Sequence, residues 1–174
     1  NIHFILEYAL KKKMKVIIDA DAINIFKNNP EALRSLVFQN QNIVLTPHEK
    51  EFKRVFGDKG TSKINKVKYA CNCLGTNLIL KGSDTIIASP KNKIAINYNA
   101  PPELATAGSG DVLAGIIGGL AASGMGVFSA SCMGVWLHGE SAKIYGKGLI
   151  ADDLVDLIPM SLANLFNKNE KNIY

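Results

Sequence analysis

A run of small residues that ends in a carboxylate is the part of this sequence best suited to chemistry. Gly108, Ser109 and Gly110 precede Asp111, and the apolar segment 112–122 that follows is long enough to form a buried helix. The start of a helix presents unpaired backbone N–H groups and partial positive charge, so the three small residues can form an anion hole for a phosphate group. A carboxylate beside that phosphate can accept a proton from a hydroxyl group. The loop therefore predicts phosphoryl transfer, with Asp111 as the general base.

A purely structural explanation of the same loop stays open. Asp is a favoured residue at the start of a helix, and short glycine-rich motifs often occur in proteins without any role in binding. The loop alone does not separate a glycine-rich turn with an acidic cap from a phosphate site. The decision depends on which other polar side chains are expected near Asp111.

Polar side chains lie at the carboxyl ends of three short apolar strands. They are Asp19 and Asp21 at and after the end of strand 15–19, His48 after strand 42–45, and Lys81 at the end of strand 77–81. In parallel α/β sheets the carboxyl ends of the strands share one edge, and ligands bind there. We therefore expect these side chains to converge with Asp111, where the ammonium of Lys81 is suited to a phosphate group. Loop capping by the two aspartates, and a solvated lysine beside a hairpin, are the alternatives.

The elements that must position these residues alternate along the chain. Apolar strands are expected at 15–19, 42–45, 77–81, 85–89 and 93–98, and helices at 2–13, 30–37, 61–74, 111–122, 127–145 and 151–158. Strands that alternate with helices are typical of a mainly parallel sheet with helices on both faces. The turn Gly82 to Asp84 is the exception, because it predicts a hairpin between two antiparallel strands.

The helix after strand 42–45 carries its own start signal. Thr46 is expected to cap it, with Pro47 at the first helical position and Glu49 completing a capping box. This capping pattern does not account for His48, so the imidazole is a candidate for binding, and a structural or solvated histidine is the alternative. His138-Gly139-Glu140, in the segment 127–145, is interpreted as helix packing and not as a metal site, because further ligands at suitable spacing are missing.

Length and charge narrow the class of protein. The chain has 174 residues, of which 47% are apolar, so we expect a single domain, 1–174, with a sizeable core. Residues 1–93 carry a formal charge of +8 and residues 94–174 a charge of −3. A basic half can meet an anionic small molecule, but the sequence has no basic stripe with interleaved aromatic residues, so nucleic acid is not an expected partner.

The three cysteines indicate a cytoplasmic protein, and the longest uncharged segment does not predict a membrane span. Cys71, Cys73 and Cys132 do not form an even set, and we expect reduced thiols. The segment 112–137 carries no charge, but Ser123-Gly124-Met125-Gly126 interrupts it and leaves parts too short to span a bilayer. Two buried helices are predicted there, and a membrane is not an expected partner.

Taken together, the motifs resemble those of a known enzyme family. They are Asp19-Ala20-Asp21-Ala22-x-Asn24, Thr46-Pro47-His48-x-x-Glu51, Leu80-Lys81-Gly82-x-x-Thr85, the segment 104–115, Trp136-Leu137-His138-Gly139 and Ala151-Asp152-Asp153-Leu154. In this order they are similar to the ADP/ATP-dependent NAD(P)H-hydrate dehydratases, the C-terminal domain of the bifunctional NAD(P)H-hydrate repair enzymes. The resemblance implies a ribokinase-like three-layer αβα sandwich with a mainly parallel sheet, of which the N-terminal part is missing here.

The resemblance also implies an activity and its residues. The family uses a nucleotide, typically ADP in bacteria, to phosphorylate the hydroxyl group of hydrated NADH or NADPH, and loss of phosphate restores the nicotinamide ring. The nucleotide-binding residues implied are Lys81, Gly82, Ser83, Asp84, Thr85 and Gly110, and the hydrate-binding residues are Asp19, Asn24, His48 and Asp111, of which Asp111 is the base. Mg²⁺ on the nucleotide phosphates, a homo-oligomer such as a tetramer, and an N-terminal epimerase domain in the full-length protein are implied in the same way.

Two other functions fit parts of the pattern. A ribokinase-like kinase of a vitamin precursor or a sugar would share Lys81 and Asp111, whereas a non-catalytic nucleotide-binding remnant would need only the nucleotide residues. The segments around Asp19 and His48 favour the dehydratase.

Overall fold

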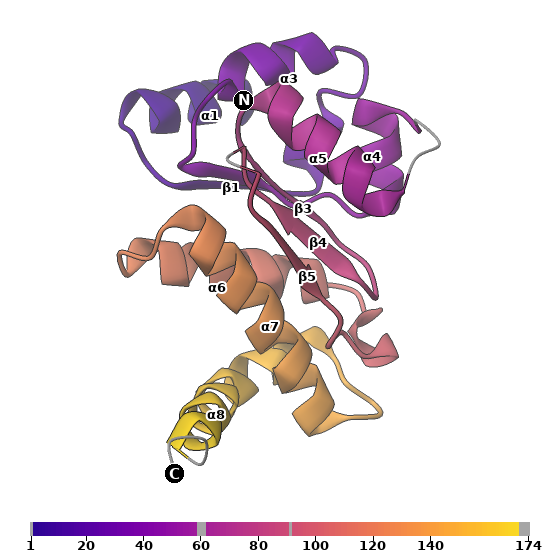
Figure 1. Ribbon diagram of the computed structural model, residues 1–174, viewed down its shortest axis with the longest axis vertical. Coiled ribbons are helices and arrows are strands. Elements are labelled where there is room, and N and C mark those ends of the chain that lie inside the picture. The colour runs from indigo at the N-terminus through magenta and orange to yellow at the C-terminus, as the bar shows by residue number, and fades with distance from the viewer. Residues whose placement is uncertain (1, 59–61, 91, 171–174) are drawn as a thin grey trace.

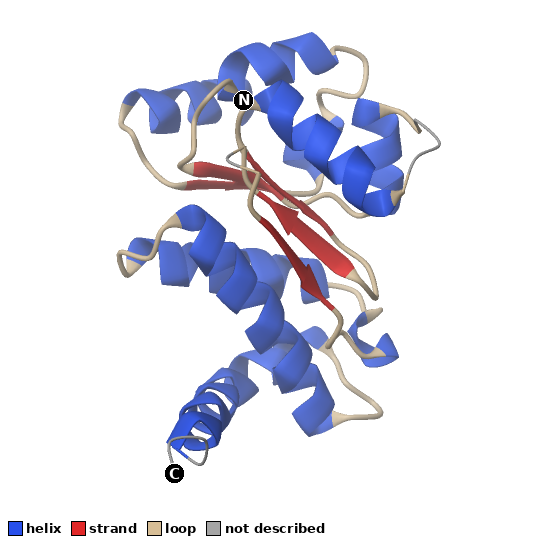
Figure 2. Cartoon of the chain, viewed as in Figure 1, coloured by secondary structure: helices blue, strands red, loops and turns tan. Residues whose placement is uncertain are grey.

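The protein consists of a five-stranded sheet that lies between two layers of helices (Figure 1, Figure 2). The computed structural model describes residues 2–58, 62–90 and 92–170. The strands are β1 (Val16–Ile18), β2 (Ile43–Leu45), β3 (Asn77–Leu80), β4 (Thr85–Ala88) and β5 (Ile94–Asn97). The helices are α1 (Ile2–Lys11), α2 (Asp21–Asn24), α3 (Pro30–Val37), α4 (Glu49–Phe56), α5 (Lys63–Leu74), η1 (Pro102–Leu104), α6 (Ser109–Ala122), α7 (Val127–Tyr145) and α8 (Ala151–Glu170).

The sheet is mixed but mainly parallel, as the sequence predicts. Its strand order is β1-β2-β3-β4-β5. The first three strands pair in parallel, and β4 is antiparallel to both β3 and β5, so β4 alone runs against the other four strands. The β3–β4 connection is the predicted hairpin. As a result the carboxyl ends of β1, β2 and β3 lie at one edge of the sheet.

Alternating side chains of the strands build a separate core on each face. Leu78 and Leu80 of β3 pack with the cluster under α1 to α5, whereas Ile79, between them, packs with the cluster under α6 and α7. This follows because successive side chains of a strand point to opposite faces. All three are fully buried, and burial of such a side chain stabilises the fold by about 1.5–3 kcal/mol. Figure 1 shows α1, α3, α4 and α5 on one side of the sheet and α6 and α7 on the other.

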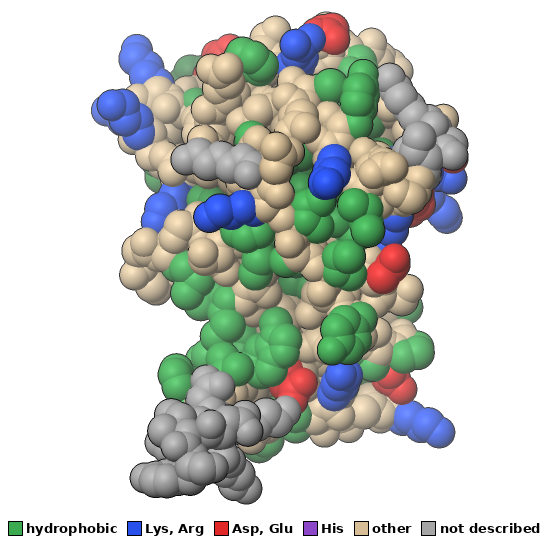
Figure 3. Space-filling view, in the orientation of Figure 1, with side chains coloured by type: hydrophobic (Ala, Val, Ile, Leu, Met, Phe, Trp, Pro, Cys, Tyr) green, Lys and Arg blue, Asp and Glu red, His purple; other side chains and the backbone are tan. Residues whose placement is uncertain are grey.

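The uncharged segment forms α6 and α7, two separate helices that pack closely. A Cβ at Gly134 of α7 would lie 2.7 Å from Ile117 Cγ1 of α6, so glycine permits the contact. Across the described ranges, no helix is both long and apolar enough to cross a bilayer. Hydrophobic side chains gather on the surface in the part of the molecule that α6 and α7 occupy in Figure 1 (Figure 3).

Several element boundaries differ from those expected. The first helix ends at Lys11, two residues early, and Thr61, the expected start of another helix, lies outside the described residues. α8 was expected to end before Pro159 but continues through it to Glu170. Proline removes one backbone hydrogen bond without forcing the helix to stop. α8 is held against α7 by the hydrogen bond between the hydroxyls of Ser141 and Ser161, 2.9 Å apart and buried.

Candidate functional site

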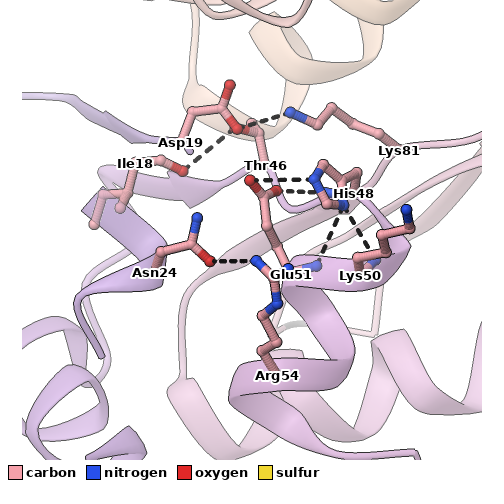
Figure 4. A network of polar contacts seen from close by, with 9 residues as sticks. All are labelled: Ile18, Asp19, Asn24, Thr46, His48, Lys50, Glu51, Arg54 and Lys81. Atoms are coloured by element: carbon pink, nitrogen blue, oxygen red, sulfur yellow. Dashed lines mark hydrogen bonds and ion pairs between the residues drawn. The ribbon is translucent and has the colours of Figure 1, made fainter. Parts of the chain in front are cut away.

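Three residues from distant parts of the chain meet at the carboxyl edge of the sheet. The Lys81 ammonium donates a 2.8 Å hydrogen bond to Oδ1 of Asp19, and the two side chains are only 20% and 13% exposed (Figure 4). A Cβ built on Gly110 would lie 3.4 Å from Lys81 Nζ and 3.6 Å from Asp19 Oδ2. The start of α6 therefore lies directly against the ion pair. The predicted convergence of Asp19, Lys81 and the glycine-rich loop is present in the structure.

Backbone pairing continues past the ends of the strands and fixes this edge. The Lys81 N–H donates to the Pro47 carbonyl at 2.9 Å, which extends the β2–β3 pairing and brings His48 opposite Lys81. Thr46 continues the β1–β2 pairing, because its N–H and its hydroxyl both donate to the Ile18 carbonyl, at 3.0 and 3.3 Å. Thr46 is therefore part of the sheet edge and does not cap α4.

His48 is the cap of α4, which corrects the expected assignment. Its Nδ1 accepts hydrogen bonds from the N–H groups of Lys50 and Glu51, at 3.1 and 3.2 Å. The capping box is completed by Glu51, whose Oε2 accepts from the His48 N–H at 2.8 Å, and not by Glu49. Since Nδ1 accepts, the proton of a neutral His48 ring lies on Nε2. The imidazole thus performs the capping task that the sequence analysis assigned to Thr46, and its half-exposed ring also reaches the cavity described next.

A cavity of about 670 Å³ adjoins this edge. It is lined by His48, by Lys81 and the turn after it, by residues of the segment 100–106, and by side chains of α6 and α7. A volume of this size suits a ligand as large as a nucleotide. The cavity therefore combines a cationic group, a helix start and a long apolar wall.

The glycine-rich loop contributes two of its three expected residues to the cavity. Ser109 and Gly110 line it, and Gly108 does not. Gly108 instead caps α6 with a φ of 83°, a conformation that glycine adopts without strain. The Ser109 hydroxyl donates to the Leu104 carbonyl at 2.8 Å, so it ties the loop to η1 and leaves the backbone to face a ligand.

The β3–β4 turn contributes four of its five expected nucleotide residues. Lys81, Gly82, Ser83 and Thr85 line the cavity. Asp84 points elsewhere, because Lys63 of α5 binds its carboxylate and its carbonyl, both at 2.6 Å. The hydrogen bond from Lys63 lowers the pKa of Asp84 below its usual value. Asp84 therefore holds the turn in place and does not line the cavity.

Three expected hydrate-binding residues lie outside the cavity lining: Asp19, which pairs with Lys81, Asn24 and Asp111. Asn24 lies at the end of α2, where its side-chain oxygen accepts from Arg54 at 3.4 Å (Figure 4). Asp111 is exposed on the first turn of α6 and directly follows Gly110, so it lies at the rim.

Ala20, between Asp19 and Asp21, has a φ of 50°, which is a strained conformation for a residue other than glycine. Such strain occurs most often at functional sites.

His138 of α7 is a cavity residue that the sequence analysis missed. Its ring lines the cavity one turn after Val135, with 7% of its surface exposed. Burial lowers its pKa to about 4, so the ring is neutral at pH 7. A backbone hydrogen bond with Ser109 opposes this lowering of the pKa, and the nearby charge of Lys81 adds to it. The sequence feature that could have indicated this role is a histidine inside an apolar helix, but helix packing explains the same feature.

Comparison with known proteins decides the family. The model of a family described as NAD(P)H-hydrate dehydratase matches residues 1–159. The chain belongs to this NAD(P)H-hydrate dehydratase family. The resemblance seen in the sequence motifs is thereby confirmed.

Named members of the dehydratase family are similar over most of this chain. An ADP-dependent (S)-NAD(P)H-hydrate dehydratase of Neisseria meningitidis is 42% identical over 149 residues, which cover 80% of this chain and 50% of the relative. A bifunctional NAD(P)H-hydrate repair enzyme of Moorella thermoacetica is 37% identical over 176 residues, covering 95% of this chain and 32% of the relative. The chain therefore spans a half or less of the length of these relatives.

Solved structures confirm the ribokinase-like fold. An ADP/ATP-dependent NAD(P)H-hydrate dehydratase of Bacillus subtilis, co-crystallised with ATP and Mg²⁺, is 27% identical, with a TM-score of 0.70 over 86% of this chain and 54% of that one. A ribokinase-like superfamily protein of Enterococcus faecalis, 24% identical, gives a TM-score of 0.77 over 93% of this chain and 58% of that one. The α/β sandwich expected for the dehydratase family is thus the fold of this chain.

Proposed function

We propose that this protein acts as an ADP-dependent (S)-NAD(P)H-hydrate dehydratase, which repairs hydrated NADH and NADPH and releases AMP and phosphate. The observation that carries the proposal is the approach of Gly110 to Lys81 and Asp19 at the mouth of the cavity, in a chain of this family. A cation, a helix start and an adjacent carboxylate at Asp111 are the groups that phosphoryl transfer requires.

The reaction proceeds in two steps. The hydroxyl oxygen of the hydrated ring attacks the terminal phosphorus of ADP, the bond from that phosphorus to the AMP oxygen breaks, and the Asp111 carboxylate accepts the hydroxyl proton. The phosphate ester then loses phosphate from its ring carbon while the neighbouring ring carbon loses a proton, and the ring double bond forms again. A positioned general base such as Asp111 accelerates a step like the first one by about 10²–10⁴-fold.

The residues divide between the two substrates. Lys81, Gly82, Ser83, Thr85 and Gly110 bind the nucleotide phosphates, and Asp84 serves them by holding the turn through Lys63. The N–H group of Gly110, in the first turn of α6, is the donor proposed for the transferred phosphoryl group, with a contribution on the order of 3 kcal/mol. The N–H groups of Ser109 and Asp111 already donate to the carbonyls of Thr106 and Gly108. On the hydrate side, His48 contacts the substrate beside Asp111, and Asp19 orients Lys81. Asn24, held by Arg54, supports the wall on that side.

Mg²⁺ is proposed to enter with the nucleotide. In the described part of the chain, no cluster of three or more His, Cys, Asp or Glu side chains is arranged to hold a metal ion. Mg²⁺ is usually bound mainly by nucleotide phosphates with one or two carboxylates. Asp19, whose Oδ2 would lie 3.6 Å from a Cβ built on Gly110, and Asp111, which follows Gly110, are the carboxylates proposed to help hold it. The ion would reduce the negative charge that the attacking hydroxyl meets.

The oligomeric state, the domain organisation and the location are also proposed from the likeness to the dehydratase family. Exposed apolar side chains on α8, among them Val155, Met160 and Phe166, suit contact with a second copy in a homo-oligomer such as a tetramer. The chain is proposed to be one domain, the C-terminal portion of a dehydratase domain. The relative named a bifunctional repair enzyme supports a further domain in the full-length protein, which the resemblance implies to be an N-terminal epimerase domain. A cytoplasmic location accords with its nucleotide substrates and its free thiols.

An assay with hydrated NADH tests the function. Recovery of NADH absorbance with ADP, together with AMP and phosphate in equal amounts, is the expected result. Phosphorylation of a vitamin alcohol or a sugar with the hydrate left unchanged would make the protein a small-molecule kinase. Binding of ADP with no turnover of either substrate class would make it a nucleotide-binding remnant.

A further inference from the structure

Helix α7 places a buried imidazole without a complete set of partners in the cavity wall. Nε2 of His138 is buried and has no hydrogen-bond partner among the residues that the structure describes. The ring itself lines the cavity together with Val135, one helical turn earlier. Buried polar atoms in folded proteins nearly always have a partner, so an unpaired one at a cavity indicates a ligand that supplies it.

The protonation state of His138 limits the chemistry of that ligand. With a pKa lowered to about 4, chiefly by burial, the ring is uncharged near neutral pH. A neutral imidazole forms hydrogen bonds with uncharged groups and gives a phosphate no charge to pair with. The phosphates already have a better site, because Lys81 and the start of α6 lie together at the sheet edge.

The surroundings of His138 suit a flat heterocycle. Pro101, Pro102, Leu104 and Val135 line the same cavity as His138 and offer no charge and no side-chain hydrogen bond. Apolar walls with a few placed polar groups are typical of sites that bind ring systems. A purine base has both an apolar face and ring nitrogens that need hydrogen-bond partners.

A second contact holds this part of α7 in place. Asn99, after β5, donates from its side-chain amide to the Trp136 carbonyl at 2.9 Å. A Cβ on Gly139 would collide with the Asn99 side chain and lie 2.9 Å from its backbone oxygen. Since Asn99 is buried and directly precedes the cavity segment 100–106, it couples the position of His138 to that part of the cavity wall.

We propose that Nε2 of His138 accepts a hydrogen bond from the amino group of the adenine base of the nucleotide, and so selects adenine over bases that carry a carbonyl group there. The inference rests on the proposed function only in taking a nucleotide as the ligand. Nothing in it depends on the hydrate or on the chemical step.

Binding of ADP and of inosine diphosphate, measured by calorimetric titration, tests the proposal. Inosine diphosphate carries a carbonyl group where ADP has an amino group. A residue that hydrogen-bonds to this edge of the base therefore binds the two nucleotides with different affinities. His138→Phe keeps a flat ring without a hydrogen-bonding nitrogen. We expect it to weaken ADP binding roughly tenfold and to bring the two affinities close together. Lys143→Ala, an exposed change on the same helix, should keep both affinities and their ratio.

Two outcomes would overturn the proposal. A preference for ADP that His138→Phe leaves intact would remove the contact with the base, and an equal loss for both nucleotides would give His138 a structural role only. His138→Gln, which can still form one hydrogen bond, should restore part of the preference, and thermal unfolding of each variant identifies those that fail to fold. Binding is measured without hydrate, so absence of dehydratase turnover would contradict the proposed function and leave this result standing.

Discussion

Lys81 and Asp19 form a 2.8 Å ion pair across the carboxyl ends of β3 and β1, with Gly110 against both of them. The two strands are separated in the sheet by β2, so the pair bridges over one strand. Its partial burial reduces screening by solvent, and an incoming phosphate group would compete with Asp19 for the ammonium. The pair therefore keeps the cation oriented toward the start of α6 before a nucleotide binds.

Removing the ammonium should weaken nucleotide binding. For Lys81→Ala we expect a loss of about 1.5–3 kcal/mol in ADP binding, or 10- to 150-fold in Kd, because a charge-assisted hydrogen bond to phosphate is lost. Titration calorimetry measures this directly. Lys27→Ala, a change of an exposed residue that does not line the cavity, is the control and should bind as the parent does. An unchanged Kd for Lys81→Ala would exclude the lysine from the nucleotide site.

Replacing the proposed base should separate turnover from binding. Asp111→Asn keeps the size of the side chain but cannot accept the hydroxyl proton, so we expect kcat to fall about 10²–10⁴-fold while the Kd for ADP changes little. Steady-state assays and calorimetry give the two values. Asp156→Asn, an equally exposed carboxylate on α8, should retain full activity. Full activity in Asp111→Asn would contradict its role as base.

The convergence of the site was predictable, because it depends on topology alone. Parallel strands bring their carboxyl ends to one edge, which is enough to expect Asp19 near Lys81. The cap of α4 was not predictable from its local pattern. Thr46 fits a capping signature, but its hydrogen bonds to Ile18 keep it in the sheet. The cap of α4 is therefore His48, two residues later.

The role of His138 depends on residues far away in the chain. Its environment is formed by the segment 100–106 and by α6, and only the folded chain brings them together. The length of α8 was missed for a related reason, because packing against α7 continues the helix past Pro159. Local sequence therefore predicts where a side chain lies in an element, and tertiary packing decides what surrounds it.

A single methyl group on α7 should destabilise the fold. For Gly139→Ala we expect a loss of about 1–3 kcal/mol in the free energy of unfolding, since the new Cβ collides with Asn99 and the helix must shift. Chemical denaturation measures the change. The matched control is Gly115→Ala on α6, where an added Cβ meets nothing within 4 Å. It should stabilise the protein by about 0.5–1 kcal/mol, because alanine favours the helix. Equal stability of the two variants would contradict the close packing of Asn99.

The buried neutral ring of His138 should also make stability depend on pH. Its pKa lies at about 4 in the folded state, below the ordinary histidine value of 6.5. Between these values the unfolded chain binds a proton that the folded chain does not, so stability falls as the pH is lowered from about 6.5 toward 4. From pH 7 to pH 5 we expect His138 to account for a loss of about 2 kcal/mol. Urea unfolding at the two pH values should show a smaller loss for His138→Phe than for the parent. His3→Gln, which changes a partly exposed histidine on α1, should keep the parental loss, and a His138→Phe variant with the same pH dependence as the parent would show that the ring is not buried in its neutral form.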